Sequence, residues 1–227
     1  KVSVGFGGGG SDYVSRNANK QENPFGGGAG GGVSISPVAF MVVGQNQIKL
    51  VPVANSSSSV DKIIDASGKI LLPGFVNTHT HLSMTLFRGL ADDLSLDSWL
   101  NDHIWPMEAN LNGDYCYIGA LLGAVELIKS GTTTFSDMYF YMEDVARAVD
   151  EAGIRAVLSY GMIDFGDAEK REAEIKENLT LFENCNGMAD GRIKVFFGPH
   201  SPYTASEELL IKVRQLADEY NMGIHIH

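Results

Sequence analysis

Apolar, strand-like segments alternate regularly with segments of helical periodicity in the last two thirds of the chain. The predicted strands lie near 70–78, 132–135, 155–160, 193–197 and 222–227. The predicted helices between them cover 114–129, 143–152, 167–182 and 206–220. Strands that alternate with helices form parallel βα units, because each crossover needs a connection of helical length. The sequence therefore predicts an α/β fold of about five βα units.

The first of these strands ends in Asn77-Thr78-His79-Thr80-His81. Side chains alternate between the two faces of a strand, so His79 and His81 project in the same direction. Imidazole is a suitable ligand for zinc, iron or nickel. Taken alone, an H-x-H pattern can also be two unrelated polar residues at the end of a strand.

The distribution of the remaining histidines favours a metal site. Five of the six histidines of the chain fall at the carboxyl ends of predicted strands: His79, His81, His200, His225 and His227. The sixth, His103, falls in a short predicted helix over 97–104. Active sites of (β/α) barrels are assembled at the carboxyl ends of the strands. This clustering favours a partial TIM-type barrel over a doubly wound sheet, which the alternation alone also allows.

Composition narrows the classes of partner. The 227 residues carry a net charge of −11, and the pI is near 4.9. A nucleic-acid backbone needs a basic protein face, so nucleic acid is not an expected partner. The sequence has no run that would span a membrane and no signal-peptide pattern, so we expect a cytoplasmic protein with a small-molecule substrate. The sequence is also compatible with a homo-oligomer.

The first 62 residues differ from the rest and are predicted to be a separate domain, followed by a second domain over 63–227. Glycine tracts at 7–10, 26–28 and 30–32 predict a loosely ordered segment, because glycine loses the most backbone entropy on ordering. Two short strands between 34 and 53 then predict a β-hairpin. The glycine tracts with V-S-I-S-P-V-A-F-M-V-V and I-K-L-V-P-V resemble the GerW-type sporulation protein family.

Residues 65–227 resemble a second family through a continuous series of motifs. These are P-G-F-V-N-T-H-T-H-L-S-M-T-L-F-R-G-L-A-D-D-L, W-L-N-D-H-I-W-P-M-E, S-G-T-T-T-F-S-D-M-Y, G-P-H-S-P-Y-T and I-H-I-H. The segment is similar to the N-terminal half of 5-methylthioadenosine/S-adenosylhomocysteine deaminases, within the metal-dependent amidohydrolase superfamily. The junction of the two resemblances, near residues 60–65, leads us to expect a chimaeric or truncated gene product.

The resemblance implies a role for several side chains. His79, His81 and His227 would bind Zn²⁺ or Fe²⁺, with His225 in a supporting place. Glu108 would accept hydrogen bonds from ribose hydroxyls, which suits a carboxylate. The remaining two implied substrate contacts are His200, at the purine, and Arg171, at the carboxylate of S-adenosylhomocysteine. For Arg171 an ion pair with Glu172 or Glu174 on the helix surface is an equal alternative.

The implied reaction is hydrolytic deamination of an adenosine derivative. The resemblance also calls for an acid–base glutamate and a late-strand aspartate, and neither matches a residue up to His227. Asp137 follows the second strand and is predicted to be a loop or helix-cap residue. We therefore expect little or no catalysis by this chain alone. Two alternatives stay open: another amidohydrolase, such as a chlorohydrolase or a guanine or cytosine deaminase, or a non-enzymatic GerW-like protein with a vestigial barrel fragment.

Overall fold

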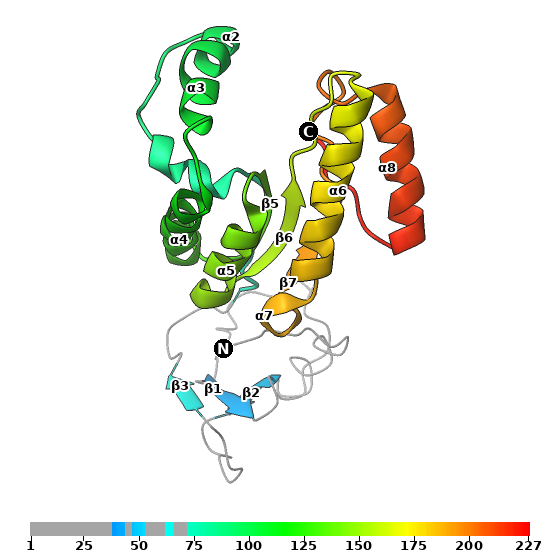
Figure 1. Cartoon of the computed structure of the whole chain (residues 1–227). Coiled ribbons are helices and arrows are strands. Elements are labelled where there is room, and N and C mark those ends of the chain that lie inside the picture. Colours follow the sequence, from blue (N-terminus) through cyan, green and yellow to red (C-terminus); the bar gives the residue numbers. More distant parts are fainter. Residues whose placement is uncertain (1–37, 44–46, 53–61, 66–71) are drawn as a thin grey trace, which may run out of the picture. The chain divides into compact units, whose positions relative to one another are not determined.

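The computed structural model describes residues 38–43, 47–52, 62–65 and 72–227 (Figure 1). The chain divides into two compact units, Lys1–Pro73 and Gly74–His227. In the first unit β1 (Val38–Val43), β2 (Gln47–Pro52) and β3 (Lys62–Asp65) form an antiparallel sheet in the order β2-β1-β3. The predicted hairpin is confirmed as the β1–β2 pair, in which Val38 lies opposite Pro52. The glycine tracts lie outside the described residues.

The second unit contains a parallel sheet, as predicted, but with four strands instead of five. Its strands are β4 (Phe75–Thr80), β5 (Thr132–Tyr139), β6 (Arg155–Tyr160) and β7 (Ile193–Val195), in that order across the sheet. The helices that alternate with them are α4 (Gly113–Lys129), α5 (Met142–Ala152), α6 (Ala168–Cys185), the short α7 (Met188–Gly191) and α8 (Glu207–Tyr220). Figure 1 shows α4, α5, α6 and α8 flanking the strands. This alternation is the predicted α/β fold.

The interior of the second unit lies between the sheet and its helices. Phe135, Leu158 and Val195 from three neighbouring strands are 0–2% exposed, and Val145 of α5 and Leu209 of α8 are fully buried against the same core. Parallel strands need cover on their faces, and the helices supply it. Within the described residues, no helix is both long and apolar enough to cross a membrane.

The ends of the sheet differ from the prediction. Residues 222–227 form no regular strand; they make a single parallel bridge between Phe197 and Ile224. The Phe197 amide donates to Gly223 O at 3.0 Å, and the His225 amide donates to Phe197 O at 2.8 Å. The neighbouring chain leaves regular geometry after Val195, and Pro199 has no N–H to extend the ladder. The segment therefore runs beside residues 197–200, which follow β7, without becoming a strand.

The connection between β4 and α4 contains more helix than the sequence predicts. A 3-10 helix, η2 (Leu82–Phe87), follows β4 directly. The helix predicted over 97–104 runs as three consecutive pieces: α2 (Leu96–Ser98), the π-helical turn η3 (Trp99–Ile104) and α3 (Trp105–Glu108). Strand β4 itself begins only at Phe75, because Pro73 and Gly74 do not continue the hydrogen-bond ladder. Residues 70 and 71 of the predicted strand lie outside the described part.

Helix α4 begins as predicted but presents an unexpected face to the core. Asn112 caps it by accepting a hydrogen bond from the Tyr115 amide at 3.0 Å. Of its large apolar residues, Ile118, Leu122, Val125 and Ile128 are about half exposed. The buried positions are the small ones: Cys116, Gly119, Ala120, Gly123 and Ala124. Small residues let η2 approach closely, and Ser83 Oγ and Thr85 Oγ1 donate to the carbonyls of Cys116 and Gly119 at 2.9 and 2.7 Å.

We predict that Gly119→Ala destabilises the fold more than Gly123→Ala. A Cβ at residue 119 would collide with the Ser83 main-chain oxygen, whereas one at residue 123 would first meet the flexible end of the Leu82 side chain. Overpacking costs about 1–3 kcal/mol and outweighs the gain of up to about 1 kcal/mol from alanine's helix propensity. Urea unfolding of both variants measures this difference, and equal or increased stability of Gly119→Ala would contradict the close packing.

Candidate metal centre and adjoining pocket

Three histidines gather at the carboxyl edge of the parallel sheet. His79 and His81 project from the end of β4, and His227 comes from the segment that pairs with Phe197, beyond the end of β7. One ring nitrogen of each lies within 4.8 Å of the others. The ring centroid of His227 is 4.8 Å from that of His79 and 5.2 Å from that of His81. The structure thus brings together the three residues for which the sequence suggested a shared cation.

Two of these rings have a defined orientation. Nδ1 of His81 lies 2.6 Å from Met138 O, and Nδ1 of His227 lies 2.6 Å from His200 O. A carbonyl oxygen only accepts, so each Nδ1 must carry the proton. In a neutral imidazole this leaves a lone pair on Nε2. Histidine ligands of metals characteristically donate their other ring N–H to a carbonyl or carboxylate in this way.

The two Nε2 atoms then face each other, which tests whether a cation fits. Nε2 of His81 and Nε2 of His227 are 3.3 Å apart. Two lone pairs at that distance repel unless a positive charge lies between them. Burial, followed by the nearby His227 and His79, lowers the pKa of His81 against the opposing effect of the Met138 carbonyl. Two nitrogens about 2.0–2.1 Å from a tetrahedral zinc ion lie about 3.3 Å apart, so the spacing suits zinc.

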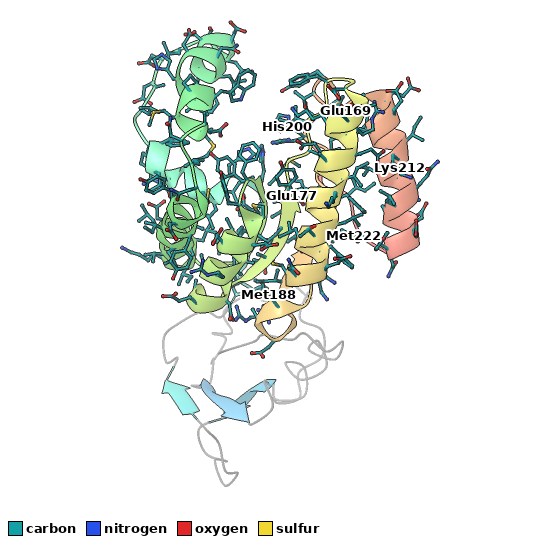
Figure 2. All side chains as sticks on the ribbon, in the orientation of Figure 1. Glu169, Glu177, Met188, His200, Lys212 and Met222 are labelled. Carbon is teal, nitrogen blue, oxygen red and sulfur yellow. The ribbon has the colours of Figure 1, made fainter. Side chains whose placement is uncertain are left out.

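His200 and His225 stand around this triad. His200 Nδ1 is 2.8 Å from Thr204 Oγ1, and its ring centroid is 4.8 Å from that of His227. His225 Nδ1 is 3.2 Å from Ser136 Oγ. Burial, with the neighbouring His227 as the next cause, lowers the pKa of both imidazoles to about 4. Both rings are therefore neutral at pH 7. Figure 2 shows His200 projecting beside α6 on the side that faces α3.

A pocket of about 220 Å³ adjoins the histidines within the second unit. Its polar lining residues include His81, Glu108 and His200. Its aromatic lining residues are Trp99, Trp105, Tyr139, Phe140, Phe165 and Tyr203. A mostly apolar cavity with a few convergent polar groups is the usual form of a small-molecule site. Glu108 and His200, predicted as substrate contacts, thus line the same pocket as one predicted metal ligand.

Glu108 is held at the pocket by a single strong hydrogen bond. The Tyr139 hydroxyl donates to Glu108 Oε1 at 2.7 Å. Burial raises the pKa of the Glu108 carboxyl above its ordinary value, while this hydrogen bond works against the rise. Tyr139 was not singled out from the sequence. Its position at the end of the T-T-T-F-S-D-M-Y segment was the available signal, since strand ends contribute site residues.

Arg171 lies elsewhere and is engaged with other groups. Its Nε donates to Asp164 Oδ2 at 2.9 Å, and its Nη2 to Ser206 Oγ at 3.1 Å. Glu208 is a further acidic neighbour at 3.5 Å. The ion pair that the sequence left as an alternative therefore exists, but its partners are Asp164 and Glu208 instead of Glu172 or Glu174. Arg171 is not among the residues that line the pocket.

Asp137 is a correction to the sequence analysis. It lies inside β5 and is fully buried, instead of in a loop or at a helix cap. Burial raises the pKa of its carboxyl to about 7, against the effect of hydrogen bonds from the Leu82 and Met138 amides. The predicted strand stopped at Phe135 because Ser136 and Asp137 are polar. The β5 strand continues because its carboxyl half meets η2, where Asp137 finds a backbone donor.

Parallel βα units with a histidine cluster at the carboxyl edge of the sheet are typical of (β/α)-barrel proteins, whose active sites lie at that edge. Comparison with known sequences gives the family. Residues 70–227 match the model of the amidohydrolase family, and the chain belongs to it. Residues 1–72 match a second family model, described as sporulation protein YtfJ. Both resemblances in the sequence analysis thus recur at family level.

Named relatives are deaminases. The chain is 86% identical over 170 residues to the 5'-deoxyadenosine deaminase of Methanobrevibacter smithii, which covers 75% of this chain and 39% of the relative. It is 56% identical over 180 residues to the 5-methylthioadenosine/S-adenosylhomocysteine deaminase of Thermococcus onnurineus, with 79% and 42% covered. The chain therefore spans about two fifths of the length of these relatives.

A solved structure shows the same architecture. An adenosine deaminase from Xanthomonas campestris with bound zinc superposes with a TM-score of 0.64 at 31% identity, covering 79% of this chain and 42% of that one. A guanine deaminase from C. acetobutylicum with bound guanine, at 18% identity and a TM-score of 0.62, shares the fold. The amidohydrolase-type barrel predicted from the sequence is confirmed for the part of the chain that the structure describes.

Proposed function

We propose that residues 74–227 form the metal- and nucleoside-binding part of a hydrolytic deaminase of adenosine derivatives. The observation that carries this proposal is the 3.3 Å separation of the inward-facing Nε2 atoms of His81 and His227. His79, His81 and His227 would hold Zn²⁺ or Fe²⁺. Such an ion lowers the pKa of a bound water from about 15.7 towards 7 and so supplies the nucleophile for hydrolysis. The names of the relatives support the reaction class.

In this proposal, different residues of the pocket bind different parts of the substrate. Glu108 accepts hydrogen bonds from ribose hydroxyls, and Tyr139 holds its carboxylate in place. His200, neutral and held by Thr204, contacts the purine. The aromatic walls exclude water and stack with the base. Arg171 would meet the carboxylate of S-adenosylhomocysteine only after leaving Asp164.

Within this reaction class, the pocket favours adenosine derivatives with an apolar 5' end. Among the described residues that line the pocket there is no lysine or arginine, and Arg171, which the family resemblance implies for this role, is paired with Asp164. A substrate carboxylate would have to be desolvated there without a cationic partner, which is costly. We therefore propose 5'-deoxyadenosine or 5-methylthioadenosine as substrate ahead of S-adenosylhomocysteine. Calorimetric titration with the three compounds tests this order, and tighter binding of S-adenosylhomocysteine would refute it.

We predict that Glu108→Gln weakens binding of 5'-deoxyadenosine by about 10- to 100-fold, because a hydrogen bond to a charged group contributes about 1.5–3 kcal/mol. The pH dependence has a definite sign. Protonation removes the acceptor charge, so wild-type binding weakens as the pH falls through the raised pKa of Glu108, at a higher pH than for an ordinary glutamate. The Gln variant should lack this dependence.

Titrations of the metal-free protein at pH 7.5 and pH 5 separate this effect from metal binding. Glu126→Gln is the matched control, because Glu126 pairs with Arg88 on an exposed surface away from the pocket. Loss of binding in Glu126→Gln equal to that in Glu108→Gln would show that the effect is not local. Unchanged binding in Glu108→Gln would remove Glu108 from the site.

A further inference from the structure

The fully buried carboxyl group of Asp137 has an unusual environment. Its Oδ1 accepts a hydrogen bond from the Leu82 amide at 3.1 Å. Its Oδ2 finds no hydrogen-bond partner among the described residues. Burying a carboxyl group with one oxygen unpaired costs free energy, so the presence of an aspartate at this position calls for an explanation. The histidines and Glu108 do not use it directly.

The explanation lies in what Asp137 and its neighbour hold. Leu82 follows His81 immediately, and the strand register places Asp137 beside Thr80, which precedes His81. The next residue, Met138, accepts the hydrogen bond from His81 Nδ1 through its main-chain oxygen. Two consecutive residues of β5 therefore fix His81 twice: Met138 fixes the ring, and Asp137 fixes the main chain on the carboxyl side.

A purely structural role, as the anchor of η2, is the competing explanation. That helix already has two other side-chain anchors, Ser83 on Cys116 O and Thr85 on Gly119 O. Gly119 and Gly123 also let it approach α4 closely. The bond from Leu82 to Asp137 differs from these because it acts at the junction between β4 and η2. His81 occupies that junction, with φ −121° and ψ 77°, outside both strand and helix geometry.

We propose that Asp137 is a positioning residue for His81: its carboxyl oxygen holds the Leu82 amide and thereby keeps the His81 ring on Met138 O, with Nε2 directed at the triad. This inference rests on the proposed role of His81 as a metal ligand. It assigns Asp137 an effect on ligand orientation beyond its effect on stability. The part of Asp137 that matters is the acceptor at Oδ1, so an amide at this position should serve nearly as well.

The test uses the full chain with three substitutions. Asp137→Ala removes the acceptor, and Asp137→Asn keeps it. Asp164→Ala is the matched control, because Asp164 is another fully buried carboxylate that accepts a main-chain hydrogen bond, from Ser206 at 2.7 Å. Zinc affinity is measured by competition with a chelating dye. The tautomer of His81 is measured in the metal-free protein from ¹⁵N shifts of the imidazole nitrogens, assigned with His81→Gln.

The expected result is a 10- to 100-fold loss of zinc affinity in Asp137→Ala, the range typical for groups that orient a metal ligand. In the same variant, the Nδ1–H signal of His81 should give way to a mixture of tautomers. Asp137→Asn should keep zinc affinity within about threefold of wild type. Asp164→Ala should lose stability while its folded form keeps wild-type zinc affinity and the His81 tautomer.

Several outcomes would overturn the inference. One is an unchanged His81 tautomer in folded Asp137→Ala; another is a loss in Asp137→Asn as large as that in Asp137→Ala. If the alanine variant does not fold, Asp137→Leu replaces it, because leucine fills the space of the carboxyl group without accepting a hydrogen bond. If neither variant folds, the zinc affinity and the His81 tautomer of Asp137→Asn decide between the two roles. A wild-type protein that binds no zinc, with a His81 tautomer that still responds to Asp137→Ala, would refute the proposed metal function and leave the positioning role standing.

Discussion

His81→Ala and His227→Ala are each expected to lower the affinity of the chain for zinc by more than about 100-fold, beyond the range that outer groups of a metal site contribute. Each substitution removes one of the two Nε2 atoms that face each other at 3.3 Å. Only His79 then remains beside the other ring to hold the cation. Competition with a chelating dye measures the affinity, and circular dichroism shows whether each variant is folded.

The controls for this prediction are histidines outside the triad. His103→Ala changes a residue of η3, which contributes no atom to the cluster, and zinc affinity should remain unchanged. His225→Ala removes the ring that contacts Ser136, and its effect should be much smaller than that of His227→Ala, two residues away. Equal losses in His225→Ala and His227→Ala would show that the assignment of the ligand within I-H-I-H is wrong.

Arg171→Ala is expected to destabilise the protein by about 3 kcal/mol, within the range for breaking a buried ion pair from one side. The Asp164 side chain is fully buried and that of Arg171 is 15% exposed, so the substitution leaves a carboxylate with less compensation in the interior. The two remaining hydrogen bonds from Ser206 keep the loss at the lower end. Urea unfolding at pH 7 gives the magnitude.

The pH dependence of this difference follows from the pKa of Asp164. Burial alone would raise that pKa, but hydrogen bonds from Ser206, the Gly166 amide and Arg171 together hold it below its ordinary value. A carboxyl group with a lowered folded pKa stabilises the fold above its unfolded pKa of about 3.9, and this contribution is lost as the pH falls through the folded value. The difference between wild type and Arg171→Ala should therefore be greatest at neutral pH and shrink below about pH 4.

Arg147→Ala breaks an exposed pair with Asp144 and should cost less than about 1 kcal/mol. If Arg171→Ala costs no more than that but weakens binding of S-adenosylhomocysteine strongly, Arg171 serves the substrate and not the fold. The role implied by the family resemblance would then hold in place of the structural one.

The sequence predicted the fold well where periodicity is local. The alternation of segments indicated the parallel sheet, and the helices predicted over 114–129 and 143–152 agree with α4 and α5 to within one residue. The prediction failed where contacts with another segment of the chain determine the local structure. Residues 222–227 have the composition of a strand, but the irregular chain after Val195 offers no continuous ladder. On α4, the buried face consists of small residues because η2 approaches closely, and the range of the helix alone does not indicate this.

The candidate site was predictable to a similar extent. The spacing of His79 and His81 on one strand face is a local property, so their proximity could be inferred. The carbonyl partners of the His81 and His227 rings lie 57 and 27 residues away, and only the folded chain shows them. The same holds for the pairing of Arg171 with Asp164 and for the burial of Asp137. Polar residues inside a strand are visible in the sequence, but their partners are not.

X-ray absorption at the zinc K-edge of the zinc-loaded chain reports the ligand set of the proposed metal site. We expect a first shell dominated by imidazole nitrogens at about 2.0–2.1 Å. The imidazole contribution should fall by about one ligand in His79→Ala, the histidine of the triad without a carbonyl anchor in this structure. A shell of sulfur, or of oxygen alone, or a spectrum that is the same in wild type and in the His79, His81 and His227 variants, would contradict it.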